Sequence, residues 1–143
     1  MKIEKIIVHH SGTDSKTTTH ESIERAHKAK NKIAIGYHGT INHEGLFKKG
    51  REEHIQGAHC RHGGWNRKSL GYCIIGNFEN EQPTQAALHT AIHYFARKCM
   101  QYNLRAKDVI SHSETGAATL CAGKNLDMNL LRKKIAELLN FTI

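Results

Sequence analysis

One apolar run near the middle of the chain, SLGYCIIGNF at residues 69–78, limits the possible folds more than any other stretch. The run is nearly continuously apolar rather than alternating, which is typical of a strand buried on both faces of a sheet. A strand of this kind needs other elements packed over the sheet to cover it. The run therefore predicts an α/β architecture with this strand at its centre.

The segments around this run predict the other elements. Residues 2–9 form a β-branched strand, and an S/T-x-x-E capping box at 18–21 opens a helix that ends near Lys30. Residues 35–41 begin a hairpin with a turn at 42–45 and a short return strand. A polar loop covers 51–68, and helix 84–102, strand 108–112 and helix 128–139, capped by Asp127, follow. This order predicts a mixed central β-sheet flanked by helices.

The length of 143 residues and the hydrophobic fraction of 38% suit one domain over residues 1–143 with one core. No apolar run approaches the roughly 20 residues of a membrane span, so no membrane insertion is expected. The start, MKIEKIIVHH, lacks the apolar region and cleavage site of a signal peptide. We expect synthesis in the cytoplasm without a signal peptide, and a monomer.

The net charge of +8 favours a polyanionic partner such as nucleic acid, an anionic membrane or an acidic cell-wall polymer. No nucleic-acid motif accompanies the charge, so no specific nucleic-acid partner is predicted. A basic surface without any specific partner explains the charge equally well. The four cysteines have irregular spacings, and without an export signal we expect them to be reduced.

Histidines and one cysteine follow two of the predicted strands. His9 and His10 end the strand KIIV, His112 follows DVIS, and Cys121 lies in the next loop. Strand ends that run in one direction share an edge of the sheet, where ligand sites gather. Two imidazoles and one thiolate make a catalytic zinc set with a fourth position open. On spacing alone, scattered structural histidines remain the more common explanation.

Four blocks in this order give the chain a resemblance to a known family. They are IIVHHSGT, IGYHGTINHEG, GAHCRHGGWNRKSLGYCIIGNFE and SHSETGAATLCAG. Together they resemble the zinc-dependent N-acetylmuramoyl-L-alanine amidases of the phage-lysozyme and peptidoglycan-recognition-protein type, over roughly residues 3–139. The resemblance implies a mixed sheet flanked by helices, with a groove for glycan and peptide and a zinc ion at its floor.

The resemblance implies that His9, His112 and Cys121 bind the zinc. The period of the strand supports His9, because His9 faces the side of Ile7 while His10 faces the opposite side. His10 is therefore expected to pack or to contact a ligand from behind. The usual Cys-Pro-Gly of the family is CAG here, with Ala122 replacing proline.

Further residues match the family near the zinc and in the groove. Tyr37 matches a tyrosine whose phenol can stabilise the oxyanion, although a strand tyrosine packed for its ring is the alternative. Thr119 matches a position that holds lysine or threonine, and its hydroxyl could donate to the same oxyanion. The resemblance implies substrate contacts for His59, Trp65 and Asn66, whereas Trp65 could instead plug the loop against the core.

The implied activity is hydrolysis of the amide between N-acetylmuramic acid and L-alanine in peptidoglycan, so the protein would act on the cell wall. Three alternatives stay open: a peptidoglycan-binding module that does not cut, a hydrolase with Cys121 as nucleophile and His112 as base, and a basic nucleic-acid binder. His89 and His93 have the i,i+4 spacing of a metal pair, but HTAIH lacks the glutamate of H-E-x-x-H. We expect this pair on a solvated helix face.

Overall fold

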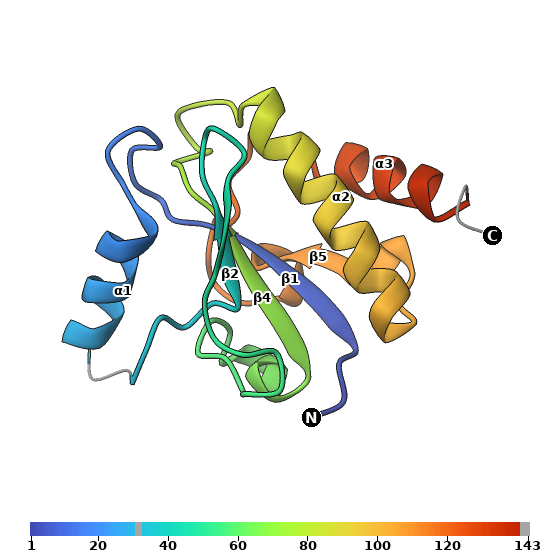
Figure 1. Ribbon diagram of the computed structural model, residues 1–143, viewed down its shortest axis with the longest axis horizontal. Coiled ribbons are helices and arrows are strands. Elements are labelled where there is room, and N and C mark those ends of the chain that lie inside the picture. The colour runs from blue at the N-terminus through green and yellow to red at the C-terminus, as the bar shows by residue number, and fades with distance from the viewer. Residues whose placement is uncertain (31–32, 141–143) are drawn as a thin grey trace.

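Five strands form one mixed sheet in a computed structural model that describes residues 1–30 and 33–140 (Figure 1). The order across the sheet is β3-β2-β4-β1-β5. β4 is parallel to β1 and β2, β1 is parallel to β5, and β2 pairs antiparallel with β3. The bounds are β1 Lys5–His10, β2 Gly39–Ile41, β3 Phe47–Lys49, β4 Ser69–Ile74 and β5 Val109–Ser111. The predicted mixed sheet, with the apolar run as its middle strand, is confirmed.

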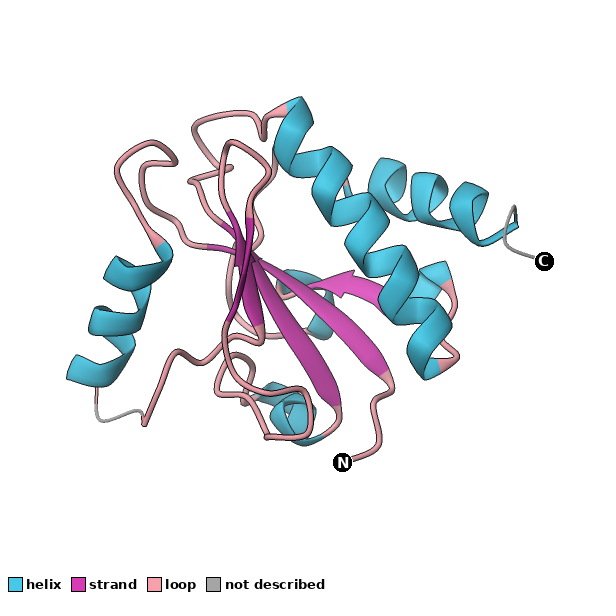
Figure 2. Cartoon of the chain, viewed as in Figure 1, coloured by secondary structure: helices cyan, strands magenta, loops and turns pink. Residues whose placement is uncertain are grey.

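Helices cover the sheet from both sides (Figure 2). α1 (His20–Ala29) lies on one side, and α2 (Gln85–Tyr102) and α3 (Met128–Asn140) lie together on the other (Figure 1). Short 3₁₀ segments occur at His62–Arg67, Ala106–Asp108 and Ser113–Thr115. The first of these lies inside the predicted loop 51–68.

The helix starts agree with the sequence apart from one shift. The capping box of α1 is Thr19 with Ser22, which exchange side-chain and backbone hydrogen bonds, and not the predicted pair at 18 and 21. Thr84 accepts from the N–H of Ala87 at the start of α2. The Asp127 carboxylate accepts from the N–H of Leu130 and caps α3, as predicted.

The predicted hairpin is shorter than expected, because β2 begins at Gly39 rather than at residue 35. His38 donates its N–H to the carbonyl of Gly71, and its Nδ1 accepts the N–H of Gly71. A side chain thus takes the place of a ladder carbonyl at this point, and the regular strand starts after it. β4 likewise ends before residue 78, where Gly76 turns the chain and donates its N–H to Ser11 Oγ.

The main core fills the space between the sheet and α2 and α3. Leu70, Tyr72 and Ile74 point from β4 into this layer and are fully buried. Phe95 of α2 and Leu131 of α3 meet them from the other side. Burying each such side chain contributes about 1.5–3 kcal/mol, so this layer dominates the stability of the fold. In the described part of the chain, no helix has the length and apolar character needed to cross a membrane.

Candidate metal centre

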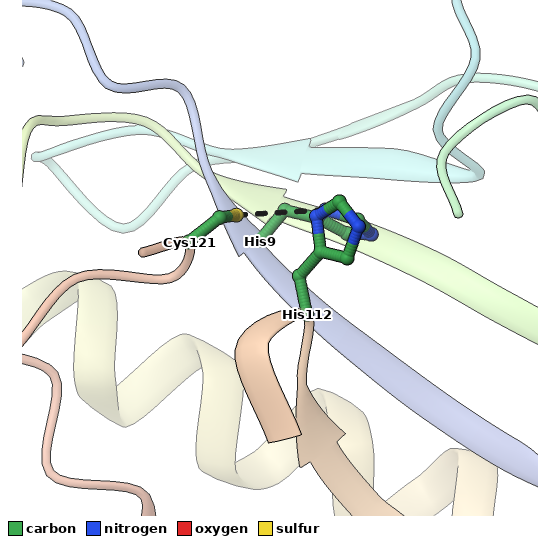
Figure 3. Close-up of side chains that lie close together, drawn as sticks. All are labelled: His9, His112 and Cys121. Carbon is green, nitrogen blue, oxygen red and sulfur yellow. Dashed lines mark hydrogen bonds between the residues drawn. The ribbon is translucent and has the colours of Figure 1, made fainter. Parts of the chain in front are cut away.

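His9 lies near the end of β1 and points to the face of the sheet opposite the main core. Its side chain is 1% exposed, and its Nδ1 lies 3.6 Å from the sulfur of Cys121 (Figure 3). His10 faces the other side, where its Nδ1 accepts the N–H of Phe78 and its ring packs against that phenyl group. This arrangement agrees with the assignment of His9 as ligand and His10 as a packed residue.

His112 reaches the same place from β5. It directly follows the strand, and its N–H donates to the carbonyl of Val8 at 3.1 Å, which fastens it to β1. The His112 and His9 rings lie with their centroids 4.6 Å apart. Because β1 and β5 are parallel, both histidines lie at the carboxyl edge of the sheet, as ligand sites in such sheets do.

Cys121 is held over this edge by hydrogen bonds within its loop. Its carbonyl accepts the N–H of Ser113 at 2.6 Å, and its N–H donates to Thr119 Oγ1 at 3.2 Å. The N–H of His10 points to the Cys121 sulfur at 3.3 Å. The peptide bond to Ala122 is cis, and Ala122 is buried in the main core. The Cys121 sulfur lies 3.6 Å from His9 Nδ1, and the residue also packs against the edge of the main core.

The three side chains form a donor set that could hold a metal ion. One donor atom from each of His9, His112 and Cys121 lies within 4.8 Å of the others. In a tetrahedral zinc site with bonds of 2.0–2.3 Å, the donor atoms lie roughly 3.3–3.7 Å apart, so the set needs only a small contraction. Two imidazoles and a thiolate suit zinc and leave a fourth position open.

The charges of the donors suit a metal cation. Burial lowers the pKa of His112, and the nearby His62 lowers it further, so its imidazole is neutral and able to bind near pH 7. Burial raises the pKa of the Cys121 thiol to about 11, partly offset by the N–H of His10. A metal must displace this proton.

Tyr37 lies beside the donor set on the segment that leads into β2. Its ring centroid is 5.0 Å from that of His9. Burial raises the pKa of Tyr37 well above its usual value, and the Cys73 and Cys121 thiols raise it further. The phenol therefore stays protonated and can donate a hydrogen bond, but it is poorly suited to act as a general base.

Thr119 lies two residues before Cys121 and is half-buried. Its hydroxyl oxygen accepts the N–H of Cys121, which leaves the hydroxyl proton for another acceptor. Tyr37 and Thr119 thus offer two neutral hydroxyl donors beside the donor set.

Two hollows lie near the donor set. His112 lines one of about 660 Å³, and Tyr37 lines the other, of about 330 Å³, against α1. The His9 ring lies close to both of these lining residues, with ring centroids 4.6 Å from His112 and 5.0 Å from Tyr37. The larger hollow is also lined by Arg51, Gln56, Gly57, Ala58, His59, Cys60, Arg61, His62, Asn66 and Ala117.

Residues 1–124 match the family model described as N-acetylmuramoyl-L-alanine amidase. The chain belongs to this amidase family. The family predicted from the four sequence blocks is thereby confirmed. The endolysin of Enterobacteria phage T3 is 33% identical over 79 residues, which is 54% of this chain and 51% of the phage protein. The chain spans about half the length of the phage endolysins it matches.

Two solved structures have the same fold. The amidase LysC from Clostridium intestinale superposes with a TM-score of 0.86 at 27% identity, covering 94% of this chain and 86% of LysC. Bumblebee PGRP-SA superposes with a TM-score of 0.78 at 27% identity, covering 91% of this chain and 81% of its own. The predicted fold class is confirmed by these neighbours.

The three residues expected to contact substrate have different surroundings in this amidase-family chain. The Asn66 side-chain oxygen accepts the N–H groups of His59 and Cys60 at 2.8 and 2.7 Å, so Asn66 holds the loop that lines the larger hollow. Trp65 is half-buried, with the Lys68 ammonium 4.3 Å from its ring. His59 lines the larger hollow but also contacts His9, with its Nδ1 2.9 Å from His9 Nε2.

Sequence reasoning missed Ser69 and Gly71, which lie next to His59. Ser69 Oγ is 3.4 Å from His59 Nε2, and a Cβ on Gly71 would lie 2.3 Å from His59 Cγ. A glycine inside a central strand is a known signal that another group approaches the backbone closely. That signal was present in SLGYC, but it did not say which group approaches.

The competing histidine pair stays on the outside of α2. His89 and His93 are exposed, their rings lie 4.2 Å apart, and His93 Nδ1 bonds the carbonyl of His89. Among the described residues, the group of three or more metal-binding side chains that lie this close is His9, His112 and Cys121. The expectation of a solvated helix face agrees with this exposure.

Proposed function

We propose that this chain hydrolyses the amide bond between N-acetylmuramic acid and L-alanine in bacterial peptidoglycan, with a zinc ion held by His9, His112 and Cys121. The observation that carries the proposal is the convergence of these three donors, one of which lines the larger hollow, in a chain of the amidase family. The protein would act on the cell wall, and that it acts as a monomer stays a prediction.

Zinc bound here would supply Lewis-acid polarisation of the scissile carbonyl and a more acidic water. The chain itself provides hydrogen-bond donors for the charge that develops on the carbonyl oxygen. Tyr37 and Thr119 would donate their hydroxyl protons to this oxygen, and such donors are strongest where water is excluded. In the reaction a bond forms from water oxygen to the carbonyl carbon, the C–N bond breaks, and the alanine amine takes up a proton.

The two hollows offer room for the two parts of the substrate, the glycan and the stem peptide. The larger one carries arginines, histidines and amides, which suit hydroxyl, amide and carboxylate groups. His59, Trp65 and Asn66 remain the proposed substrate-side residues of this loop. The smaller hollow is lined by Ser11, Thr13 and Thr18 as well as Tyr37.

Release of L-alanine-terminated peptides from purified muropeptides, followed by mass spectrometry, tests the proposal. We expect release by the wild type, loss of release with a zinc chelator, and recovery when zinc is restored. His112→Ala should abolish release, because it removes a metal ligand, whereas His93→Ala on the exposed face of α2 should retain it.

Other outcomes would contradict the proposal. Wild-type protein that sediments with peptidoglycan but releases no peptide would indicate a binding module. Release that survives chelation but is lost after alkylation would indicate a thiol hydrolase with Cys121 as nucleophile.

A further inference from the structure

A line of buried hydrogen-bonding groups leads away from His9 on the side opposite the donor set. His9 Nε2 lies 2.9 Å from His59 Nδ1, and His59 Nε2 lies 3.4 Å from Ser69 Oγ. Ser69 Oγ in turn donates to the carbonyl oxygen of Trp65 at 2.7 Å. His9, His59 and Ser69 are at most 9% exposed, so solvent contributes little to these bonds.

The number of protons in this line fixes its direction. The Trp65 carbonyl can only accept, so the single hydroxyl proton of Ser69 points to it. Ser69 Oγ must then accept a hydrogen bond from His59, which places the proton of a neutral His59 on Nε2 and leaves Nδ1 unprotonated. The unprotonated Nδ1 of His59 accepts a hydrogen bond from His9, so His9 carries its proton on Nε2. The lone pair of His9 is then on Nδ1, the nitrogen that lies 3.6 Å from the Cys121 sulfur.

We infer that His59 and Ser69 are positioning residues that fix the tautomer and the ring orientation of His9 for metal binding. The inference rests on the proposed zinc site. A ligating histidine is usually held by a partner at its other ring nitrogen, and loss of such a partner typically costs 10–100-fold in metal affinity. Here the partner of His9 is the neutral imidazole of His59. A neutral partner suits a site in which the Cys121 thiolate already supplies negative charge.

The packing around His59 supports this role. A Cβ on Gly71 would lie 2.3 Å from His59 Cγ, and one on Gly57 would lie 2.6 Å from His59 Cδ2. The absence of side chains at Gly57 in the loop and at Gly71 in β4 thus leaves space for the His59 ring. Asn66 holds the backbone of His59 at the same time. The ring is therefore constrained in position as well as in hydrogen bonding.

The first test compares two substitutions of His59 by zinc affinity, measured by competition with a chromophoric chelator. His59→Leu removes the acceptor for His9 Nε2–H, and we expect affinity to fall by about 10–100-fold. His59→Asn can place its side-chain oxygen near the former Nδ1, and it should retain most of the affinity. His20→Leu is the control, because it removes a buried imidazole that bonds Thr40 and lies outside this line. Equal zinc affinity in folded His59→Leu and wild type would overturn the inference.

A second variant and a spectroscopic measurement test the inference even if His59→Leu does not fold. Ser69→Ala removes only the hydroxyl that orients His59, and we expect a smaller loss of zinc affinity in the same direction. Imidazole ¹⁵N NMR of the zinc-free protein reports the tautomer of His9 directly. We expect the proton on Nε2 in the wild type and a mixture of tautomers in Ser69→Ala.

The two readouts separate this inference from the proposed function. A His9 proton on Nδ1 in the zinc-free wild type would overturn the inference even if the protein were a zinc amidase. A proton on Nε2 in a protein that binds no zinc would instead refute the proposed function and leave the hydrogen-bonded line in place.

Discussion

The two faces of the sheet differ in what fills them. On the face under α2 and α3, Leu70, Tyr72 and Ile74 of β4 lie in one large apolar cluster. On the opposite face, Cys73 of β4 and Ile75 just beyond it belong to a small cluster with Ile23 and Ile35. Buried polar side chains, among them His9, His38, His59 and Thr40, complete this second layer.

The same strands supply both faces, because successive side chains of a strand alternate. In β1, Ile6 and Val8 enter the large cluster, while His9 points to the opposite face and belongs to the donor set. A hollow also occurs on the side of α2 and α3. It has a volume of about 540 Å³, lies between these two helices and is lined by Leu88, Ile92 and Leu130 among others. What distinguishes the site face is the convergence of donors rather than the presence of a hollow. The large apolar cluster and the converging donors thus lie largely on opposite faces of one sheet.

The largest expected effect is on the face of the sheet under α2 and α3, where Phe95→Ala should lower the free energy of unfolding by about 3–5 kcal/mol. Phe95 is fully buried and packs against Tyr72, so its loss leaves a cavity. Denaturant unfolding measures the change, and the zinc affinity of the folded fraction should stay near that of the wild type. Leu120→Ala, at a residue that is 72% exposed, is the control and should change stability by about 0.5 kcal/mol or less. A large fall in the zinc affinity of folded Phe95→Ala would break the division between the faces.

The next effect compares one tyrosine from each face. Tyr37→Phe should lower kcat by about 100-fold with KM nearly unchanged, because the phenol would donate only to the developing oxyanion. Tyr72→Phe removes a hydroxyl that bonds Tyr94 in the main core, and it should lower stability by about 1 kcal/mol with kcat unchanged. Steady-state kinetics on a soluble muropeptide and denaturant unfolding measure both. Equal losses of kcat in the two variants would mean that the hydroxyl at 37 acts through packing alone.

The sequence predicted the elements of the fold better than their ends and faces. The apolar run identified the central strand, and Thr84 and Asp127 identified two helix starts. The spacing of Leu88, Ile92, Phe95 and Cys99 predicts the inward stripe of α2. Phe95 and Cys99 are fully buried as predicted, whereas Leu88 and Ile92 are only partly buried and the neighbouring Ala87 and Ala91 are buried instead. Small residues allow α2 to approach the sheet closely, and an apolar period does not reveal which side of the stripe does so.

The strand ends indicated His9 or His10, His112 and Cys121, the resemblance implied His9, His112 and Cys121, and the structure brings these last three side chains together. The contacts behind them could not be predicted, because they join residues far apart in sequence. His9 and His59 are 50 positions apart, and no local pattern indicates that their rings bond. Likewise, the hydrogen bond from Gly71 to the side chain of His38 makes the regular strand start later than predicted. Side-chain to backbone bonds of this kind compete with regular ladders and leave little trace in periodicity.

The smallest expected effect concerns the buried histidines that set the site face apart. Burial lowers the pKa of His38, whose ring lies between the Ile55 carbonyl and the N–H of Gly71. The hydrogen bond to the Ile55 carbonyl opposes this shift, Arg51 lowers the pKa further, and Glu53 raises it. Between the usual value of about 6.5 and the lower folded value, the unfolded chain binds a proton that the folded chain does not. The free energy of unfolding therefore falls with decreasing pH in this window, by at most about 1.4 kcal/mol per pH unit for one such group. In His38→Gln this slope should be reduced, whereas His89→Gln on the solvated helix face should keep it. Denaturant unfolding from pH 7.5 to 5, with a chelator present so that metal release does not contribute, measures both slopes. If His38→Gln kept the full pH dependence of the free energy of unfolding, that dependence would arise from groups other than His38. The buried neutral imidazole of His38 would then not account for the loss of stability at low pH.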